Sequence, residues 1–334
     1  MQPTILFSDR DVRALLPMRE CIDVMRGALR AVAAGTAILP LRTVIRLPDS
    51  PNAFATMPAV LGDDRPVLGA KIITVFPGND STPYDAHIGV VLLFDSTHGS
   101  LLAIADASSI TAIRTSAVSG LATSLLARDD ASELAILGAG VLAMPHLEAV
   151  RCVRPIRRVR VWSRSGTRAT AFAERAHRET GLDVVTCAGV EEAVHGADVV
   201  CTITASRTPV LEGRWLSPGV HINAVGASLA SARELDSAAV AAARLFVDRR
   251  ESALAEAGDY LIPLAEGAIG AAHILGELGE LVSGSVTGRT QRDDITLFKS
   301  LGLAVEDVAA LRHIHDKGRA SGAGVPVSLG GLRT

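Results

Sequence analysis

The chain has 334 residues, of which 48% are hydrophobic and 21% are charged, with a formal net charge of −3 at pH 7. This length is sufficient for two domains, and the charge balance gives no sign of a nucleic-acid-binding surface. No apolar run is long enough to span a membrane, and the N-terminus lacks the layout of a signal peptide. The four cysteines are scattered without a metal-binding spacing. We therefore expect a cytoplasmic protein with no metal site.

The first third of the chain predicts an amphipathic helix followed by an antiparallel sheet. Apolar residues recur at helical spacing over residues 10–35. Short apolar runs at 41–47, 68–76 and 89–94 are then separated by clusters of proline and glycine. Such a pattern is typical of strands joined by turns.

Three cations lie where the pattern predicts burial. Lys71, one of only three lysines in the chain, sits within an apolar strand-like run, and Arg42 precedes another. Arg114 belongs to an otherwise apolar row of a helix predicted over 109–126. Because a buried cation needs a partner, two interpretations stay open. The three side chains converge on one small anion, most simply a substrate carboxylate, or each pairs with an internal carboxylate such as Asp106.

The most specific motif follows a predicted buried strand at 134–137. Gly138 and Gly140 stand two residues apart, and Ala143 takes the small-residue position of a G-x-G-x-x-G/A fingerprint. Gly138 permits a tight turn, and Gly140 lets a pyrophosphate approach the backbone. The N–H groups that open the next helix, predicted over 141–153, would face the phosphates. We expect five turn residues to contact a dinucleotide: Gly138, Ala139, Gly140, Val141 and Leu142.

The fold class predicted from these elements is α/β. Further strands are expected at 158–162, 183–186, 198–202, 220–225 and 245–248, which gives a Rossmann-type dinucleotide-binding domain over residues 119–310. A split α+β domain, residues 1–118 and 311–334, would bind the substrate. A last helix predicted over about 303–319 would return to this first domain.

The end of the second strand of the dinucleotide-binding domain indicates which cofactor is preferred. NAD-binding domains usually place an acidic residue there to hold the ribose 2′-hydroxyl. This chain has Ser163, Arg164 and Ser165, with Arg168 one helical turn further on. An arginine and hydroxyl groups would bind a 2′-phosphate that a carboxylate would repel. We predict a preference for NADP(H), with NAD(H) possible; the alternative is that Arg164 is simply solvated.

At this point the chain resembles the ornithine cyclodeaminase/mu-crystallin family over nearly its whole length. Two of the matching stretches are Thr-Ala-Ile-Arg-Thr at 111–115 and His-Ile-Asn-Ala-Val-Gly at 221–226. The others are Lys71 and residues 41–44, 57–59, 138–141, 233–235, 246–248, 256–259 and 297–302. The resemblance implies a Rossmann domain joined to a split domain for substrate binding and dimerisation, and hence a homodimer.

The resemblance also implies roles for individual residues. Arg42, Lys71 and Arg114 would bind the substrate carboxylate, and residues 163–165 the 2′-phosphate. The nicotinamide would lie near Thr204, Ala205, Val225 and Ser300. We add Arg114 and Ser228 to the expected cofactor contacts. Candidate catalytic residues are Lys71, Ser228 and His87, although His87 is equally compatible with a cofactor contact or an ordinary core residue.

The chain departs from the cyclodeaminase pattern at two acidic positions. Ser228 stands where those enzymes carry a catalytic aspartate, and Ala55 replaces a second acidic residue. Cyclodeamination needs a carboxylate to position and deprotonate the side-chain amine, whereas reduction of a preformed cyclic imine does not. The sequence therefore favours an NADPH-preferring ketimine reductase that converts Δ1-pyrroline-2-carboxylate or Δ1-piperideine-2-carboxylate to L-proline or L-pipecolate. The alternatives are an ornithine cyclodeaminase, an alanine-type amino-acid dehydrogenase, or an NADPH-dependent binding protein like mu-crystallin.

Overall fold

The computed structural model describes residues 3–62 and 65–330. The chain divides into two compact units, Met1–Thr115 with Gly302–Thr334, and Ser116–Leu301. The sequence placed the two boundaries at 118/119 and 310/311. The second boundary differs because helix α11 (Ala304–Ser321) is continuous and lies entirely within the first unit. The predicted α/β class, with a Rossmann-type domain and a split α+β domain, is confirmed.

The first unit is built on a mixed eight-stranded sheet. Its strand order is β16-β1-β7-β6-β5-β4-β2, with β3 also paired to β4. Only the β1–β7 pair is parallel among these pairings of described strands. The strands are β1 (Thr4–Phe7), β2 (Ala37–Ile38), β3 (Thr43–Arg46), β4 (Ala53–Leu61), β5 (Val67–Val75), β6 (His87–Asp95), β7 (Leu101–Asp106) and β16 (Val325–Val327). A 3-10 turn, η1 (Pro77–Ser81), joins β5 to β6.

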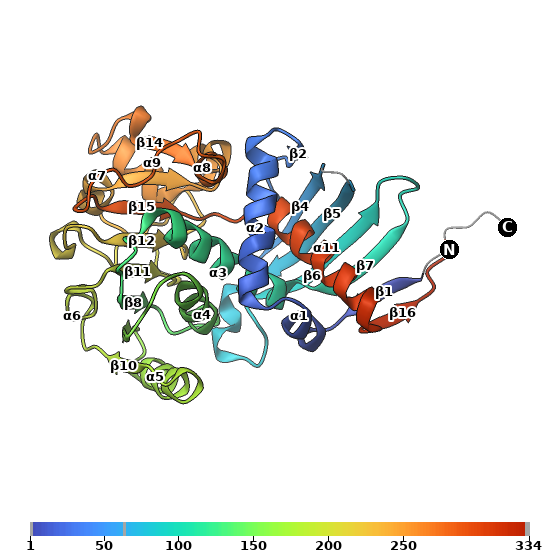
Figure 1. Ribbon diagram of the computed structural model, residues 1–334, viewed down its shortest axis with the longest axis horizontal. Helices are drawn as coiled ribbons and strands as arrows, with labels where there is room; N and C mark the ends of the chain where they lie inside the picture. The colour runs from blue at the N-terminus through green and yellow to red at the C-terminus, as the bar shows by residue number, and fades with distance from the viewer. Residues whose placement is uncertain (1–2, 63–64, 331–334) are drawn as a thin grey trace. The chain divides into compact units, whose positions relative to one another are not determined.

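Helices cover one face of this sheet. In Figure 1, α11 runs across β4 to β7 with α2 (Met18–Ala33) beside it. The single helix predicted over residues 10–35 is two helices, α1 (Asp9–Leu15) and α2. The break occurs at Pro17, which caps α2 and has no N–H with which to continue α1.

The second unit contains an eight-stranded parallel sheet in the order β10-β9-β8-β11-β12-β15-β13-β14. The strands are β8 (Glu133–Leu137), β9 (Arg158–Trp162), β10 (Asp183–Thr186), β11 (Val199–Thr202), β12 (His221–Ala224), β13 (Arg244–Val247), β14 (Ile274–Glu277) and β15 (Thr296–Lys299). Helix α3 (Ala107–Leu126) begins in the first unit and ends in the second. The remaining helices are α4 (Ala143–Val153), α5 (Gly166–Thr180), α6 (Val190–Val194), α7 (Ser237–Ala242), α8 (Arg250–Glu256), α9 (Gly258–Ala265) and α10 (Leu278–Ser283), with short 3-10 turns η2 (Gly213–Trp215) and η3 (Ala271–His273).

The order of this sheet reverses at β8. Strands β9 and β10 extend to one side of β8, whereas β11, β12 and β15 extend to the other. Strands β11, β12 and β15 are completely buried, as expected for a parallel sheet covered on both faces. In open parallel sheets, ligands bind outside the carboxyl ends of the strands at such a reversal.

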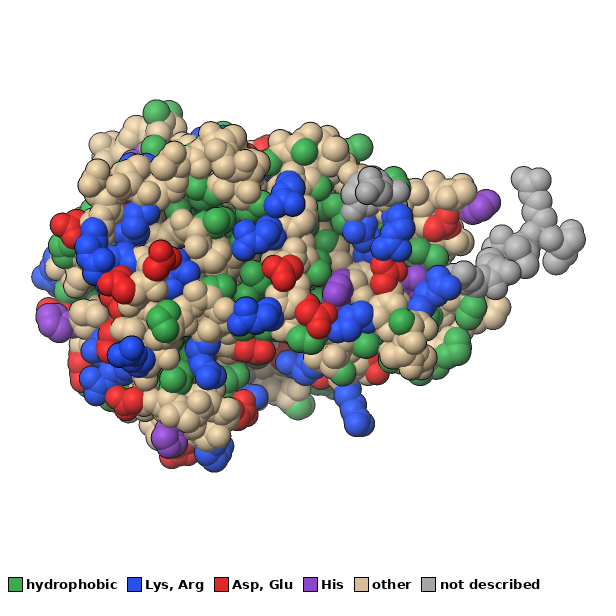
Figure 2. Space-filling model, viewed as in Figure 1, with side chains coloured by type: hydrophobic (Ala, Val, Ile, Leu, Met, Phe, Trp, Pro, Cys, Tyr) green, Lys and Arg blue, Asp and Glu red, His purple; other side chains and the backbone are tan. Residues whose placement is uncertain are grey.

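The visible surface carries mixed charge. Figure 2 shows lysine and arginine side chains interspersed with aspartate and glutamate on this face. Over residues 3–62 and 65–330, no helix is long and apolar enough to cross a membrane. The same described residues contain no cluster of three histidine, cysteine or acidic side chains that could hold a metal ion.

Candidate active site

Lys71 lies inside the first unit, on the helix-covered face of the sheet. It is the fifth residue of β5, between Met57 of β4 and Val91 of β6, and only 2% of its surface is exposed. Its Nζ lies 2.9 Å from Oδ2 of Asp307, in the first turn of α11. Thr111 Oγ1 accepts a longer bond of 3.5 Å from the same ammonium group. The predicted buried lysine is therefore paired with a buried carboxylate.

Arg114 belongs to the same cluster. Its Nε donates to Asp307 Oδ1 at 2.9 Å, and its Nη1 donates to Glu306 Oε2 at 2.8 Å. All of these charged side chains are buried, and the two carboxylates occupy the helix N-terminus, where the macrodipole favours negative charge. The planar guanidinium bonds the two carboxylates through separate nitrogens held in a fixed geometry.

The cluster perturbs the pKa values of its members. Burial would raise the pKa of Asp307, but the charges of Arg114 and Lys71 outweigh burial and the net shift is downward. Burial is the largest influence on Lys71 and lowers its pKa to about 8, although Asp307 opposes this shift. The charges of Arg114 and Arg42 lower the pKa of Lys71 further. Lys71 is therefore cationic at neutral pH but close to its titration point.

Arg42 adds a third cation to the cluster. It is half-buried, and its Nη2 donates to the carbonyl oxygen of Gly302 at 3.3 Å. Together, Arg42, Lys71 and Arg114 carry three positive charges against the two negative charges of Glu306 and Asp307. A group of cations gathered in this way suits a ligand with a carboxylate.

The other residues predicted near this cluster behave differently. Asp106, the carboxylate suggested as an internal partner, accepts hydrogen bonds from the backbone N–H and hydroxyl of Ser109 at the start of α3. His87 is the first residue of β6, and the residue as a whole is exposed. Desolvation of its ring nevertheless lowers the ring's pKa, and the charge of Lys71 lowers it further. His87 therefore lies within electrostatic range of Lys71 and is neutral at pH 7.

Sequence reasoning did not identify Glu306 and Asp307. Both lie in the apolar run Leu303-Ala304-Val305-Glu306-Asp307-Val308-Ala309 and are fully buried. The same signal that singled out Lys71, a charge where the pattern predicts burial, is present at these two positions. Applied to carboxylates as well as to cations, it would have found both partners.

The glycine turn of the second unit has the geometry that a dinucleotide requires. Gly138 has φ of +117°, and a side chain there would meet the carbonyl oxygen of Ile203 at 2.8 Å. A Cβ built on Gly140 would meet no atom within 4 Å, so there is open space for a phosphate. No side chain caps α4, whose N-cap is Leu142, and its first turn has no acidic residue. Val141 is 74% exposed, beside the turn. These features fit a bound pyrophosphate.

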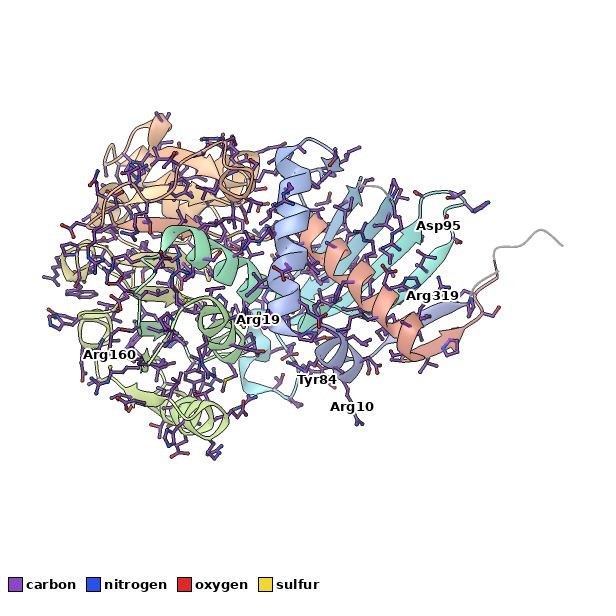
Figure 3. All side chains as sticks on the ribbon, viewed as in Figure 1. Arg10, Arg19, Tyr84, Asp95, Arg160 and Arg319 are labelled. Carbon is purple, nitrogen blue, oxygen red and sulfur yellow. The ribbon has the colours of Figure 1, made fainter. Side chains whose placement is uncertain are left out.

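The predicted 2′-phosphate site lies beside this turn. The backbone N–H of Gly138 donates to the carbonyl oxygen of Trp162 at 2.8 Å, and residues 163–165 follow directly. Arg164 is exposed, whereas the Ser165 hydroxyl caps α5 by accepting from the Arg168 N–H. Arg160, labelled in Figure 3, lies earlier on the same strand and pairs with Glu133 at 2.9 Å. Arg164 and Arg168, the two cations predicted to bind the 2′-phosphate, both follow the carboxyl end of β9.

The predicted nicotinamide contacts lie beyond the carboxyl ends of neighbouring strands of the parallel sheet. Thr204 follows β11, Val225 follows β12 and Ser300 follows β15, and these three strands are consecutive in the sheet. Ala205 is exposed next to Thr204, and Ser228 is half-buried in the loop after β12. The Ser300 N–H donates to the carbonyl oxygen of Ala224 at 3.0 Å, which ties two of these strand ends together.

Comparison with known proteins gives consistent results. The model of the ornithine cyclodeaminase/mu-crystallin family matches residues 3–322. Ketimine reductase mu-crystallin of Mus musculus is 42% identical over 84% of this chain and 86% of its own length.

Two solved structures cover almost the whole fold. Δ1-pyrroline-2-carboxylate reductase of Thermococcus litoralis, in complex with NADH and L-proline, is 37% identical, covers 97% of this chain and 100% of its own, and has a TM-score of 0.94. An archaeal alanine dehydrogenase dimer with bound NAD is 29% identical, covers 98% of this chain and 99% of its own, and has a TM-score of 0.92.

Proposed function

Because this chain belongs to the ornithine cyclodeaminase/mu-crystallin family, we propose that it is an NADPH-preferring ketimine reductase of cyclic imino acids. Its substrates would be Δ1-pyrroline-2-carboxylate, Δ1-piperideine-2-carboxylate or both, and its products L-proline and L-pipecolate. The coarser class is an NAD(P)H-dependent oxidoreductase acting on C=N bonds. The relatives named as ketimine and pyrroline-2-carboxylate reductases support this class over nearly the whole chain.

The observation that carries the proposal is the buried cluster of the first unit. Its three cations favour a substrate with a carboxylate, and two of them, Lys71 and Arg114, are held by carboxylates that are themselves buried. A flat cyclic imino acid has one such group next to the imine carbon. Fixing the carboxylate therefore orients the reacting carbon, which makes catalysis largely a matter of positioning.

The cluster also supports reduction over cyclodeamination. Ala55 has a buried methyl group and lies two residues from Met57, on the same face of β4 as the Lys71 cluster. An acidic residue at position 55 would point to this face. The two described carboxylates of the cluster, Glu306 and Asp307, are engaged with Lys71 and Arg114. Neither is in a position to serve as base for a substrate side-chain amine without giving up a buried ion pair.

The dinucleotide, when bound, supplies the hydride. The chain's own residues bind the carboxylate and handle the proton that the imine nitrogen needs as it becomes an amine. Lys71 is a candidate proton donor because its pKa is lowered to about 8. His87, the other candidate from the sequence, is less suited to this role, because burial and the charge of Lys71 lower the pKa of its ring. The Ser228 hydroxyl is uncharged at neutral pH, so Ser228 would orient the cofactor or the substrate.

The NADPH preference rests on Arg164, Arg168 and the Ser163 hydroxyl at the end of β9. The Ser165 hydroxyl is engaged in capping α5, so its contribution to a 2′-phosphate would compete with that role. The relatives' structures name NADH and NAD as their cofactors. The preference for NADPH is therefore our own proposal and does not come from these relatives.

We further propose a homodimer formed through the first unit. The sheet face opposite α11 carries apolar side chains from β4, β5 and β6 in four cross-strand rows. Phe54, Leu68, Ile88 and Val90 on this face are each 37% to 42% exposed. An apolar sheet face of this kind marks an interaction surface, and a second copy is the partner that a self-complementary patch favours.

The test of the function is a substrate screen with the purified protein. Oxidation of NADPH and of NADH is followed at 340 nm with Δ1-pyrroline-2-carboxylate, Δ1-piperideine-2-carboxylate, and pyruvate with ammonia. We expect turnover with the cyclic imines and little with pyruvate. L-Ornithine is then incubated with the oxidised cofactor, and ammonia is measured. Strong ammonia release would restore the cyclodeaminase interpretation, whereas binding of imine and cofactor without turnover would favour a binding protein.

A further inference from the structure

A second buried charged network lies in the dinucleotide-binding unit. Its centre is Glu234, which lies in the segment before α7. The Glu234 residue has no exposed surface. Asp259, in the first turn of α9, accepts hydrogen bonds from the backbone N–H groups of Glu234 and Leu235 at 2.8 and 3.0 Å. Lys299, the last residue of β15, lies 3.0 Å from Asp259. The family-matching stretches 233–235, 256–259 and 297–302 therefore meet in one place.

The Glu234 carboxylate is shared between two loops. Oε1 accepts from the backbone N–H and the hydroxyl of Thr204, both at 2.7 Å. Oε2 accepts from the backbone N–H of Gly226 at 2.7 Å and from the Thr202 hydroxyl at 2.9 Å. Thr204 lies in the loop after β11 and Gly226 in the loop after β12. One side chain thus ties together the two loops that carry the predicted nicotinamide contacts.

Lys299 also holds the loop after β12. Its Nζ donates to the carbonyl oxygens of Ala224 and Ala227, at 3.2 and 2.5 Å, on either side of Val225 and Gly226. Burial, followed by the charge of Asp259, raises the pKa of Glu234, so holding this carboxylate here has an energetic cost. Such a cost is typical of a polar network that fixes a functional conformation.

We propose that Glu234 is a positioning residue for the nicotinamide end of the cofactor, acting through Thr204 and Gly226, and that Asp259 and Lys299 hold it in place. The inference rests on the proposed function, because it requires that the second unit bind a nicotinamide dinucleotide. It assigns to the network no contact with the reacting atoms. It predicts that the network controls the nicotinamide half of the cofactor without controlling the adenosine half, which the glycine turn and the end of β9 would hold.

Glutamine at position 234 is a sharp test because each carboxylate oxygen accepts one backbone N–H. The amide group of Glu234→Gln presents an NH₂ toward either Thr204 or Gly226, where a donor would then face a donor. A hydroxyl can rotate to adapt, but a backbone N–H cannot. One of the two loops must therefore move, while the size of the side chain and the packing around it are unchanged.

The experiment measures cofactor binding by isothermal titration calorimetry, independently of turnover. Each protein is titrated with NADPH and with 2′-phospho-ADP-ribose, which lacks the nicotinamide, and again with NADH and ADP-ribose. Glu234→Gln should weaken binding of NADPH and NADH by about 10-fold to 100-fold, as expected for loss of bonds to a buried charge. Binding of the two fragments should change by less than about twofold, since the broken bonds lie at the other end of the site.

Asp198→Asn is the matched control. Asp198 also accepts two backbone N–H groups, from Ser132 and Glu133, and pairs with an arginine, but it lies at the amino ends of β8 and β11. The Asp198→Asn variant should leave the ratio of cofactor affinity to fragment affinity unchanged. Thr202→Val, which removes one hydroxyl bond to Glu234 and keeps the shape, should reproduce the Glu234→Gln effect in weaker form, and it decides the question if Glu234→Gln fails to fold.

The outcomes separate the two proposals. If the wild-type protein binds neither cofactor nor fragment, the proposed function is wrong. If the wild-type protein binds all four ligands and the position 234 and 202 variants bind them equally well, Glu234 does not position the nicotinamide. Equal weakening of cofactor and fragment would also overturn the inference, because it would indicate a general structural role.

Discussion

Lys71 Nζ lies 2.9 Å from Asp307 Oδ2, and neither side chain is more than 3% exposed. The sequence left open whether Lys71 binds a substrate anion or neutralises an internal carboxylate. The pairing shows that these two roles need not be alternatives. Lys71 does neutralise an internal carboxylate, but Asp307 is also bound by Arg114. Because Lys71 shares Asp307 with Arg114, and Arg42 acts on Lys71 as a further cation, both roles are compatible.

Lys71→Met should therefore lose stability as well as activity. Removing one partner of a buried pair costs about 3–5 kcal/mol of unfolding free energy. We expect kcat/KM for the cyclic imine to fall by roughly 10²-fold or more, because the carboxylate is no longer held and oriented. Cofactor affinity should be unchanged, because the proposed cofactor contacts are predicted mainly in the other unit. The measurements are urea unfolding, steady-state kinetics and cofactor titration.

The double variant Lys71→Met with Asp307→Asn separates the two roles. Replacing Asp307 removes the charge that Lys71→Met leaves partly compensated, so stability should recover toward the wild-type value. Activity should stay low, because the cation that binds the substrate is still missing. Recovery of turnover together with stability would show that Lys71 acts only as the partner of Asp307.

The pH dependence of anion binding should report the titration of Lys71. Its pKa of about 8 lies below the ordinary lysine value of 10.5. Between these values the unfolded chain binds more protons than the folded chain, so the Lys71 contribution to stability rises with pH across this window. Substrate binding has the opposite dependence, because only the ammonium form attracts a carboxylate.

We expect the affinity for pyrrole-2-carboxylate, a planar anion without a basic imine nitrogen, to decrease as the pH rises through about 8. The anion is titrated into the protein saturated with cofactor, from pH 6.5 to 9.5. Lys71→Arg provides the comparison, because a guanidinium stays charged over this range. An affinity that is constant with pH in the wild-type protein would exclude Lys71 as the titrating anion contact.

The cofactor preference is predicted to depend on Arg164. Arg164→Ala should lower kcat/KM for NADPH by roughly 10-fold to 150-fold, since a charge-assisted bond to the 2′-phosphate is lost. The value for NADH should stay the same. Arg158→Ala is the matched control, because Arg158 lies at the amino end of the same strand and pairs with Asp183. A wild-type preference for NADH, or an equal effect of the two variants, would contradict the assignment.

The sequence predicted those parts of the fold that depend on local pattern. The bounds of β9 and β10 match the expected 158–162 and 183–186, because β9 alternates arginine with apolar residues and β10 is rich in β-branched residues. Strand β15 was not predicted, although it lies between β12 and β13 in the sheet. Its place depends on pairing between segments that are distant in the chain, and no local period encodes that pairing.

The same distinction applies to the candidate site. Lys71 and Arg114 could be found because a charge in an apolar run is visible locally. Their partners could not be assigned, since Arg114 and Glu306 are separated by 192 residues and meet only when α11 packs on the sheet. The network around Glu234 is of the same kind. Its motifs matched the family, but their contact with one another required the folded sheet.

The apolar outer face of the first sheet predicts how the oligomer can be broken. Val90 lies on β6 opposite Ile72, with Leu68 and Ile88 on the same face, and is 37% exposed. Val90→Glu would place a charge in the middle of the proposed dimer interface, where it would be desolvated without a partner. We expect this variant to be monomeric at concentrations where the wild-type protein is a dimer, as measured by light scattering after size-exclusion chromatography. Val185→Glu is the control, because Val185 is also a strand valine with 37% exposure but belongs to β10 of the other unit. It should remain dimeric, and a wild-type protein that is monomeric at all concentrations would rule out this interface.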